Sequence, residues 1–320
     1  MLSIVIPAYN VEQYIEECLN SIIYQIELSE FSHEIIIIND GSTDSTLDTL
    51  NAFSMRYNYI KIVSQENKGQ SAARNLGLKL INNEYIWLID ADDMIASGAI
   101  EYIEKKLGQL DVDILCFSGA VLEDSVNQFA SESLSYKRTN SEGVESPAEF
   151  VKNIKQSQLT YFVQPCHYIF KSVLSKKVNF LEGVIYEDNL FTTNLFFSRK
   201  NKIFSTNKEL YIRRLRDNST MTSQMTEHNV ESFYNVMQEL LNNRGLYNNH
   251  VCSKFTDEFI TSMLNSYLIS LHRVHTFSFL KRIKSVFKCL EISKNIMNKN
   301  TLILLFIPTI VYKFFKKIKG

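Results

Sequence analysis

The amino-acid sequence predicts an α/β fold in which helices flank a mainly parallel sheet and a mainly helical C-terminal region follows. Apolar runs alternate with amphipathic stretches through residues 3–89, as in repeated strand–helix units. Glu34–Ile38 contains four consecutive isoleucines, which is typical of a strand covered on both faces. From about His228 onward, apolar residues recur mainly with helical spacing.

The predicted elements of the first part follow the order βαβαβαβ, which implies parallel strands with right-handed crossovers. The strands are Ser3–Ile6, Glu34–Ile38, Ile60–Val63 and Tyr85–Ile89, and the helices are Val11–Ile26, Thr46–Met55 and Ser71–Ile81. Further along, the patterns predict strands at Asp113–Phe117, Cys166–Phe170 and Leu210–Arg214, a helix at Tyr186–Phe197 and a polar loop with short pieces at Glu123–Ser146. We divide the chain into residues 1–222, with halves 1–110 and 111–222, a helical region 223–300 and a tail 301–320.

The charges are unevenly distributed along the 320 residues, although the formal net charge is only −1. Leu271–Gly320 holds 11 of the 34 Lys and Arg residues and one acid, Glu291, so the rest of the chain has a formal charge of −11. A basic end suggests an anionic partner surface. It carries no nucleic-acid-binding motif, so nucleic acid is not an expected partner.

The cysteines and the N-terminus point to a cytosolic protein. The five cysteines are scattered without a CxxC pair, which argues against a zinc knuckle or a redox pair and favours buried reduced thiols. The first residues lack a basic region and a cleavage site, so they are expected to form a strand and not a signal peptide.

Unusual polarity follows the ends of the predicted parallel strands, where open sheets of this kind bind ligands. The strongest signal is Asp90-Ala91-Asp92-Asp93 after Tyr85–Ile89. Three carboxylates within four residues repel one another unless a cation compensates, and Mg²⁺ or Mn²⁺ takes one or two carboxylates plus phosphate oxygens. The plainer interpretation is a solvated turn before a helix near Ser97.

Two further strand ends carry candidate nucleotide contacts. After the isoleucine strand, Asp40 could accept a hydrogen bond from an imide N–H such as that of uracil, and Gly41 lets the backbone approach a flat base. Ser42–Ser45 equally suit a capped strand-to-helix turn. Asn67, Lys68 and Arg74 flank a helix N-terminus, which attracts phosphate, but Arg74 could instead pair with Asp90 or Asp40.

Together with Ile4–Asn10, these stretches resemble the GT-A glycosyltransferases of family 2 over Leu2 to about Leu107. The resemblance implies a GT-A fold with a Rossmann-like sheet, a nucleotide-sugar-binding half at 1–110 and an acceptor-side half at 111–222. It implies Asp90 and Asp92 as the DxD pair, with Asp92 the leading ligand of Mn²⁺ or Mg²⁺ and Asp93 assisting metal or acceptor. The nucleotide-sugar contacts it implies are Pro7, Ala8, Tyr9, Asn10, Glu12, Asp40, Gly41, Ser42, Asn67, Lys68, Arg74, Asp90, Ala91 and Asp92.

Two weaker resemblances lie in the second half. Gly183–Phe191 is similar to the family's "ED" element, which implies Asp188 as the general base with Glu187 beside it; otherwise the two acids only favour a helix N-terminus. Leu210–Ser219 also resembles a family stretch in which many relatives have a histidine where this chain has Arg216. Arg213 or Arg216 could bind diphosphate, or both could belong to a surface arginine cluster. We interpret His272 and His275, which lack a third ligand nearby, as surface residues.

The tail combines an apolar stretch, Leu302–Ile307, with aromatic and lysine residues after Pro308. It is shorter than the ~20 residues that a spanning helix needs, so an interfacial anchor on the inner face of the cytoplasmic membrane fits better. The alternative is a terminal helix packed on the body.

Other enzyme classes lack their motifs in this chain. No GxGxxG follows the first strand, no GxxxxGK[ST] occurs, and the glycine-rich triphosphate loop of a sugar-phosphate nucleotidyltransferase is absent. The processive synthases' QxxRW is also absent, because the single tryptophan, Trp87, follows Ile86. The resemblance to family 2 implies an inverting, metal-dependent transferase that moves a hexose or N-acetylhexosamine from a UDP-sugar to a glycan or lipid-linked oligosaccharide in bacterial surface polysaccharide synthesis. A non-catalytic, membrane-associated partner of another transferase remains the alternative from a different class.

Overall fold

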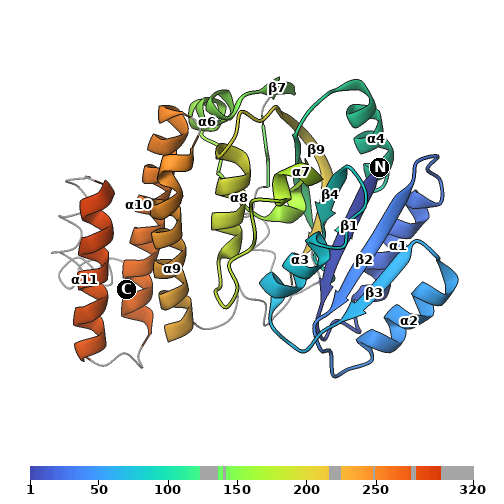
Figure 1. Ribbon diagram of the computed structural model, residues 1–320, viewed down its shortest axis with the longest axis horizontal. Helices are drawn as coiled ribbons and strands as arrows, with labels where there is room; N and C mark the ends of the chain where they lie inside the picture. The colour runs from blue at the N-terminus through green and yellow to red at the C-terminus, as the bar shows by residue number, and fades with distance from the viewer. Residues whose placement is uncertain (123–135, 140–141, 216–224, 248, 275–278, 297–320) are drawn as a thin grey trace.

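The computed structural model describes residues 1–122, 136–139, 142–215, 225–247, 249–274 and 279–296. They form a nine-stranded mixed sheet flanked by helices, with a group of long helices at one end of the molecule (Figure 1). The strand order is β3-β2-β1-β4-β8-β6-β9-β5, and β7 pairs with β9.

The N-terminal part of the sheet is parallel, as predicted. β1 (Leu2–Ala8) lies between β2 (His33–Asn39) and β4 (Tyr85–Leu88), and β3 (Ile60–Ser64) pairs with β2. The intervening helices are α1 (Ile15–Ile26), α2 (Thr46–Arg56) and α3 (Gln70–Leu78). α1 begins later than predicted because the carbonyl of Val11 first closes a turn with the amide groups of Tyr14 and Ile15.

The second part of the sheet mixes directions. β8 (Tyr168–Lys171) runs antiparallel to both β4 and β6 (Ile114–Leu122), whereas β9 (Ile203–Arg214) runs parallel to β6. The short strands β5 (Met94–Ile95) and β7 (Gly143–Glu145) are antiparallel to β9. The helices here are α4 (Ala99–Gln109), α6 (Pro147–Gln156), α7 (Ser172–Ser175) and α8 (Glu187–Phe197), and η1 (Pro165–His167) is a 3₁₀ turn.

Three strand predictions in this part were wrong at their edges. The strand predicted at Asp113–Phe117 is β6, which runs from Ile114 to Leu122. Cys166 and His167 belong to a 3₁₀ turn that starts at Pro165, since proline supplies no backbone donor for a ladder. The strand predicted at Leu210–Arg214 begins at Ile203, because a polar run in its middle hides the alternation.

The isoleucine strand shows why the sheet is covered on both faces. Successive side chains of a strand point to opposite faces. Ile35 and Ile37 join one apolar cluster with α1, whereas Ile36 and Ile38 join another that includes α3 and α8. All four are fully buried, so burial on both sides requires the uninterrupted apolar run seen in the sequence.

The C-terminal helices form their own apolar cluster. α9 (Glu227–Asn243), α10 (His250–Arg273) and α11 (Phe279–Ile296) stand side by side in Figure 1, and Leu190 of α8 packs into their cluster. α9 starts with a capping box between Thr226 and Asn229. The helical region therefore rests on α8, while the domain boundaries proposed from the sequence stay predictions.

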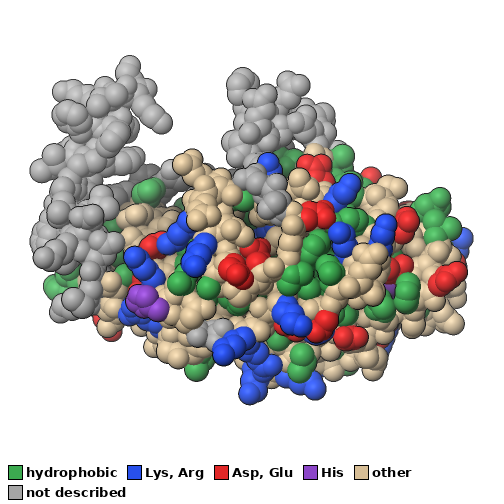
Figure 2. Space-filling model, turned by 90° about the horizontal axis from the view of Figure 1, so that it is seen from above, with side chains coloured by type: hydrophobic (Ala, Val, Ile, Leu, Met, Phe, Trp, Pro, Cys, Tyr) green, Lys and Arg blue, Asp and Glu red, His purple; other side chains and the backbone are tan. Residues whose placement is uncertain are grey.

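The cysteines, the surface charges and the lengths of the helices can be compared with what the sequence predicts. All five cysteines lie within the described residues, are buried and form no disulfide. Lys and Arg side chains are interspersed with Asp and Glu over the described surface in Figure 2. Among the described helices, none has the length and apolar character to cross a membrane. The predicted tail anchor lies outside the described residues.

Gly77 allows the close contact between α3 and β1. A Cβ at Gly77 would lie 2.3 Å from Cγ1 of the buried Val5. We expect Gly77→Ala to lower the free energy of unfolding by about 1–3 kcal/mol, the usual cost of overpacking a rigid core. Gly108→Ala in α4 is the matched control, since a Cβ there meets nothing within 4 Å. Urea unfolding of both variants tests this, and equal stability would contradict the steric argument.

Candidate active site at the carboxyl edge of the parallel strands

Asp40, directly after β2, ties two loops of the predicted nucleotide site together. Its carboxylate is 3% exposed. Oδ1 accepts hydrogen bonds from Gln65 Nε2 (2.7 Å) and the amide of Lys68 (2.8 Å), and Oδ2 accepts from the amide of Gly69 (2.8 Å). Asp40 therefore orders the segment that leads into α3, and its predicted contact with uracil would add a fourth donor.

At Gly41 the backbone of the loop after β2 approaches the backbone of the loop after β3. Gly41 has φ +72°, and a Cβ there would lie 2.8 Å from the backbone nitrogen of Asn67. The structure thus requires glycine for a contact between two loops. The predicted approach to a flat base remains a prediction.

The loop after β1 is tied to the loop after β2. Oδ1 of Asn10 accepts a hydrogen bond from the amide of Thr43 (2.8 Å), and the amide of Asn10 donates to Ser42 Oγ (3.2 Å). Glu12 accepts from the amide of Ser45 (2.8 Å). Pro7 and Ala8 are buried in β1, whereas Tyr9 at the strand end is 47% exposed, so its ring is open to a stacking partner.

The acidic turn follows β4 by one residue and has one buried member. The carboxylate of Asp93 is 4% exposed and accepts from Tyr211 Oη (2.7 Å) and the amide of Arg214 (2.8 Å). Burial, then the charges of Asp90 and Asp92, raise the pKa of Asp93 to about 8. Asp90 and Asp92 are partly exposed, so the turn presents two carboxylates outward and uses the third internally.

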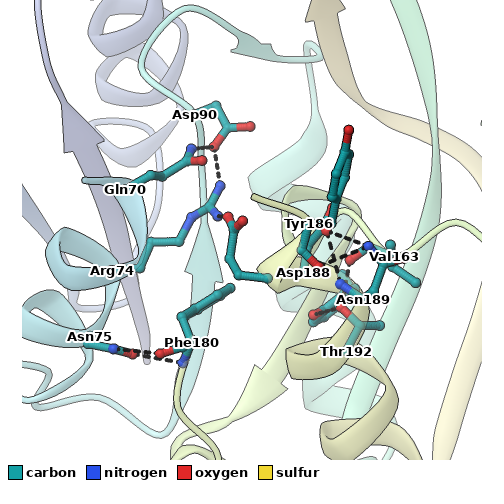
Figure 3. Close-up of polar contacts among 12 residues, drawn as sticks. Gln70, Arg74, Asn75, Asp90, Val163, Phe180, Tyr186, Asp188, Asn189 and Thr192 are labelled. Carbon is teal, nitrogen blue, oxygen red and sulfur yellow. Dashed lines mark hydrogen bonds and ion pairs between the residues drawn. The ribbon is translucent and has the colours of Figure 1, made fainter. Parts of the chain in front are cut away.

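Arg74 lies buried between the acidic turn and α8. Its guanidinium donates to Asp90 Oδ1 (2.7 Å) through Nη2 and to Glu187 Oε1 (3.0 Å) through Nη1, and it lies over the ring of Phe180. Although burial opposes the charge, the carboxylates of Asp90 and Glu187 raise the pKa of Arg74. The pairing with Asp90 that the sequence offered as the plainer interpretation is what the structure contains (Figure 3).

The predicted general base sits at the start of α8. Tyr186 caps this helix with φ +71°, a left-handed conformation. Oδ1 of Asp188 accepts from the amide of Asn189 (2.9 Å) and from Asn189 Nδ2 (3.1 Å). Desolvation, then the charge of Glu187, raises the pKa of Asp188 to about 7, a range suited to a base at neutral pH.

The arginines of β9 have protein partners. Arg213 donates to Tyr136 Oη and lies over its ring. Arg214 donates to the carbonyl of Asp92 (3.2 Å) through Nε and to the carboxylate of Glu17. Arg216, the other predicted diphosphate ligand, lies outside the described residues, as do His275 and the side chain of His272.

The predicted site residues converge on one edge of the sheet. Adjacent residues of the α3 start link two of them, since Gly69 binds Asp40 and the side chain of Gln70 donates to Asp90 Oδ1 (3.1 Å). Arg74 then joins Asp90 to Glu187. Arg74 and Glu187 are 113 positions apart in the sequence. Within the described part of the chain, no group of three or more His, Cys, Asp or Glu side chains forms a ready metal site.

Three residues that support the site were not predicted from the sequence. Tyr211 supports the acidic turn by donating to Asp93 and accepting from the amide of Asp90 (3.3 Å). Gln70 and Asn75 hold Asp90 and the segment before α8. All three stood within stretches already singled out, but only contacts over long sequence separations show what they do.

Comparison with known proteins decides the family. The model of "Glycosyl transferase family 2" matches residues 3–177, more than half of the chain. The chain belongs to glycosyl transferase family 2. The resemblance inferred from the sequence is thereby confirmed, and the protein is a glycosyltransferase.

Two curated relatives share its sequence over most of its length. Glycosyltransferase GlyG of Streptococcus pneumoniae is 29% identical over 232 residues, 70% of this chain and 74% of that protein. Poly(ribitol-phosphate) beta-glucosyltransferase of Bacillus spizizenii is 30% identical over 247 residues, 75% of this chain but 36% of that protein. The chain thus spans only about a third of the second relative.

A solved structure shares the fold. S. aureus TarS 1-349 in complex with UDP-GlcNAc superposes with a TM-score of 0.67 at 20% identity, over 96% of this chain and 86% of that one. The predicted GT-A fold, with its helical C-terminal region, is confirmed. The assignment to a glycosyltransferase family also disfavours the sugar-phosphate nucleotidyltransferase weighed from the sequence.

Proposed function

We propose that this family 2 glycosyltransferase is inverting and metal-dependent, and that it moves a hexose or N-acetylhexosamine from a UDP-sugar to a hydroxyl of a glycan or lipid-linked oligosaccharide. One observation carries the proposal: Arg74 joins Asp90 of the acidic turn to Glu187, the neighbour of the candidate base Asp188. The UDP-GlcNAc complex of TarS supports the donor class, and the poly(ribitol-phosphate) beta-glucosyltransferase relative supports a role in bacterial surface polymer synthesis.

The donor nucleotide is proposed to lie over the loops that Asp40 organises. Tyr9 offers an exposed ring for the base, and the helix N-terminus at Gln70 attracts phosphate. Asn67 and Lys68 border this surface, because the amide of Lys68 is held by Asp40.

The acidic turn fits a divalent cation by its donor set. Asp92 and Asp90 would hold Mn²⁺ or Mg²⁺, which prefers carboxylate oxygen and completes its shell with substrate phosphate. Among the described residues, both side-chain partners of Asp90 bind Oδ1. A bound cation supplies positive charge to a leaving diphosphate. Burial, and then the charges of Asp90 and Asp92, raise the pKa of Asp93, and a cation at this turn would reduce the repulsion among the three carboxylates.

Asp188 is proposed to take the proton from the acceptor hydroxyl. That oxygen then attacks the anomeric carbon on the face opposite UDP, so one displacement inverts the configuration. Of the two adjacent acids, Glu187 forms the ion pair with Arg74, whereas the hydrogen bonds of Asp188 among the described residues are with Asn189.

Activity is expected to rise with pH around neutrality. A base works only when deprotonated, and the pKa of Asp188 is raised to about 7. We expect kcat to fall about tenfold for each pH unit below 7 and to level off above about pH 8. A pH–rate profile at saturating donor measures this, and a flat profile between pH 5.5 and pH 8, bounds set about the raised pKa, would contradict it.

UDP release from a panel of UDP-sugars, with and without Mn²⁺, tests the function. The panel contains UDP-linked glucose, galactose and their N-acetyl forms. Metal-stimulated release from one donor, and faster release with an acceptor glycan, is the expected result. No metal-stimulated release with any donor would favour the non-catalytic partner of another transferase.

Peripheral attachment to the inner face of the cytoplasmic membrane through residues 301–320 is proposed from composition alone. Flotation with anionic liposomes compares the full chain with a truncation after Asn300. We expect the full chain to float and the truncated one to stay behind. Equal flotation of both proteins would contradict membrane attachment through residues 301–320.

A further inference from the structure

The start of α3 also contacts the segment that precedes α8, at a second point beside Arg74. Oδ1 of Asn75 accepts from the amide of Phe180 (2.9 Å), and Nδ2 donates to the carbonyl of Phe180 (2.9 Å) and to Glu182 Oε1 (2.9 Å). Asn75 is buried, and its pair of contacts with Phe180 resembles the pairing of two backbone strands (Figure 3). The sequence separation of 105 residues makes this a tertiary clamp.

Arg74 completes this clamp from the same turn of α3. Its side chain is 4% exposed and lies over the ring of Phe180, the residue held by Asn75. Both terminal nitrogens already donate to carboxylates, Asp90 on one side and Glu187 on the other. Nε is buried and has no hydrogen-bond partner among the described residues, so the two carboxylates bind the guanidinium through its terminal nitrogens. Because the residue is buried, it is poorly exposed to a diphosphate.

The clamp joins the two halves of the proposed chemistry. Asp90 belongs to the acidic turn after β4, and Glu187 is the first residue of α8 and precedes Asp188. α8 starts from the left-handed Tyr186, whose ring stacks on Phe233 of α9, so the helix start is held from the other side as well. Arg74 of α3 is hydrogen-bonded both to this helix start, at Glu187, and to the acidic turn, at Asp90.

We propose that Arg74 and Asn75 are positioning residues, which fix the start of α8 relative to the acidic turn so that Asp188 and the donor face each other. Arg74 acts through Asp90 and Glu187, and Asn75 acts through Phe180 and Glu182. This rests on the proposed roles of Asp188 and the acidic turn. It replaces the direct phosphate contact that the sequence suggested for Arg74.

Kinetics separate positioning from donor binding. For Arg74→Lys, which keeps the charge but cannot span both carboxylates, and for Asn75→Ala, we expect kcat to fall about 100-fold, the size of effect that a displacement of about 1 Å produces. Donor KM, and the Kd of UDP with Mn²⁺ measured by calorimetry, should stay within about threefold. A rise of about tenfold or more in KM and Kd with kcat nearly unchanged would show that Arg74 binds the donor and overturn the proposal.

Hydrogen exchange tests the clamp without relying on turnover. We expect faster amide exchange in peptides covering residues 180–190 of both variants, and unchanged exchange in α2. Glu182→Ala is the milder companion, since it removes one of the three Asn75 contacts and should give a smaller effect of the same kind. Unchanged exchange at 180–190 in all three would overturn the clamp. If the wild type releases UDP from no donor, the proposed function is wrong. The exchange experiment still tests the clamp in that case, because it does not depend on turnover.

Discussion

Asp188→Asn is expected to lower kcat by about 10²–10⁴-fold, the usual contribution of a general base. The amide keeps the size of the side chain and can still accept from the amide of Asn189 through Oδ1, so the start of α8 should stay folded. It cannot take a proton from the acceptor. The affinity for UDP should remain nearly that of the wild type, because the base acts on the acceptor side.

Steady-state transfer and UDP calorimetry on the purified variant measure both quantities. Asp48→Asn is the matched control, because Asp48 also lies in the first turn of a helix, α2, but is exposed. It should transfer sugar as the wild type does. Wild-type turnover by Asp188→Asn would refute the assignment of the base, and a joint loss of UDP affinity would point to a folding defect.

Much of the fold could be predicted because its signals are local. The run Ile35–Ile38 indicates burial on both faces, and polar residues stand close to strand ends, with Asp40 directly after β2 and Asp90 one residue beyond β4. Parallel topology then brings the carboxyl ends of neighbouring strands to one edge. The convergence of the residues that follow β1, β2, β3 and β4 therefore follows from the parallel arrangement of these strands.

The rest depends on contacts that no local pattern encodes. β5 has two residues and exists because it pairs with β9, more than a hundred positions later. Tyr211 holds Asp93 over a separation of 118 residues, and Asn75 holds Phe180 over 105. The sequence offered Arg74 a phosphate contact or an ion pair, and the structure contains ion pairs with Asp90 and Glu187, while the phosphate contact stays untested.

Asp92→Ala is expected to abolish the gain in UDP affinity that Mn²⁺ provides. Even residues outside the direct ligands of a metal contribute about 10–100-fold to its affinity, so loss of the leading ligand should cost at least about 100-fold. The turn itself should persist, because the amide of Asp93 donates to the carbonyl of Asp90 (3.1 Å) and Arg214 holds the carbonyl of Asp92. Both contacts use backbone oxygens that the substitution leaves in place.

Calorimetric titration of UDP with Mn²⁺ and with EDTA distinguishes a lost cation from a damaged nucleotide site. Asp92→Ala should bind UDP equally weakly in both buffers, at the level of the wild type in EDTA, while Asp48→Ala should keep the full manganese effect. If Asp92→Ala retains that effect, the cation is held elsewhere. The pairing of Arg74 with Asp90 would then be purely structural, since the proposed connection from the clamp to the donor's phosphates runs through a cation on Asp90 and Asp92.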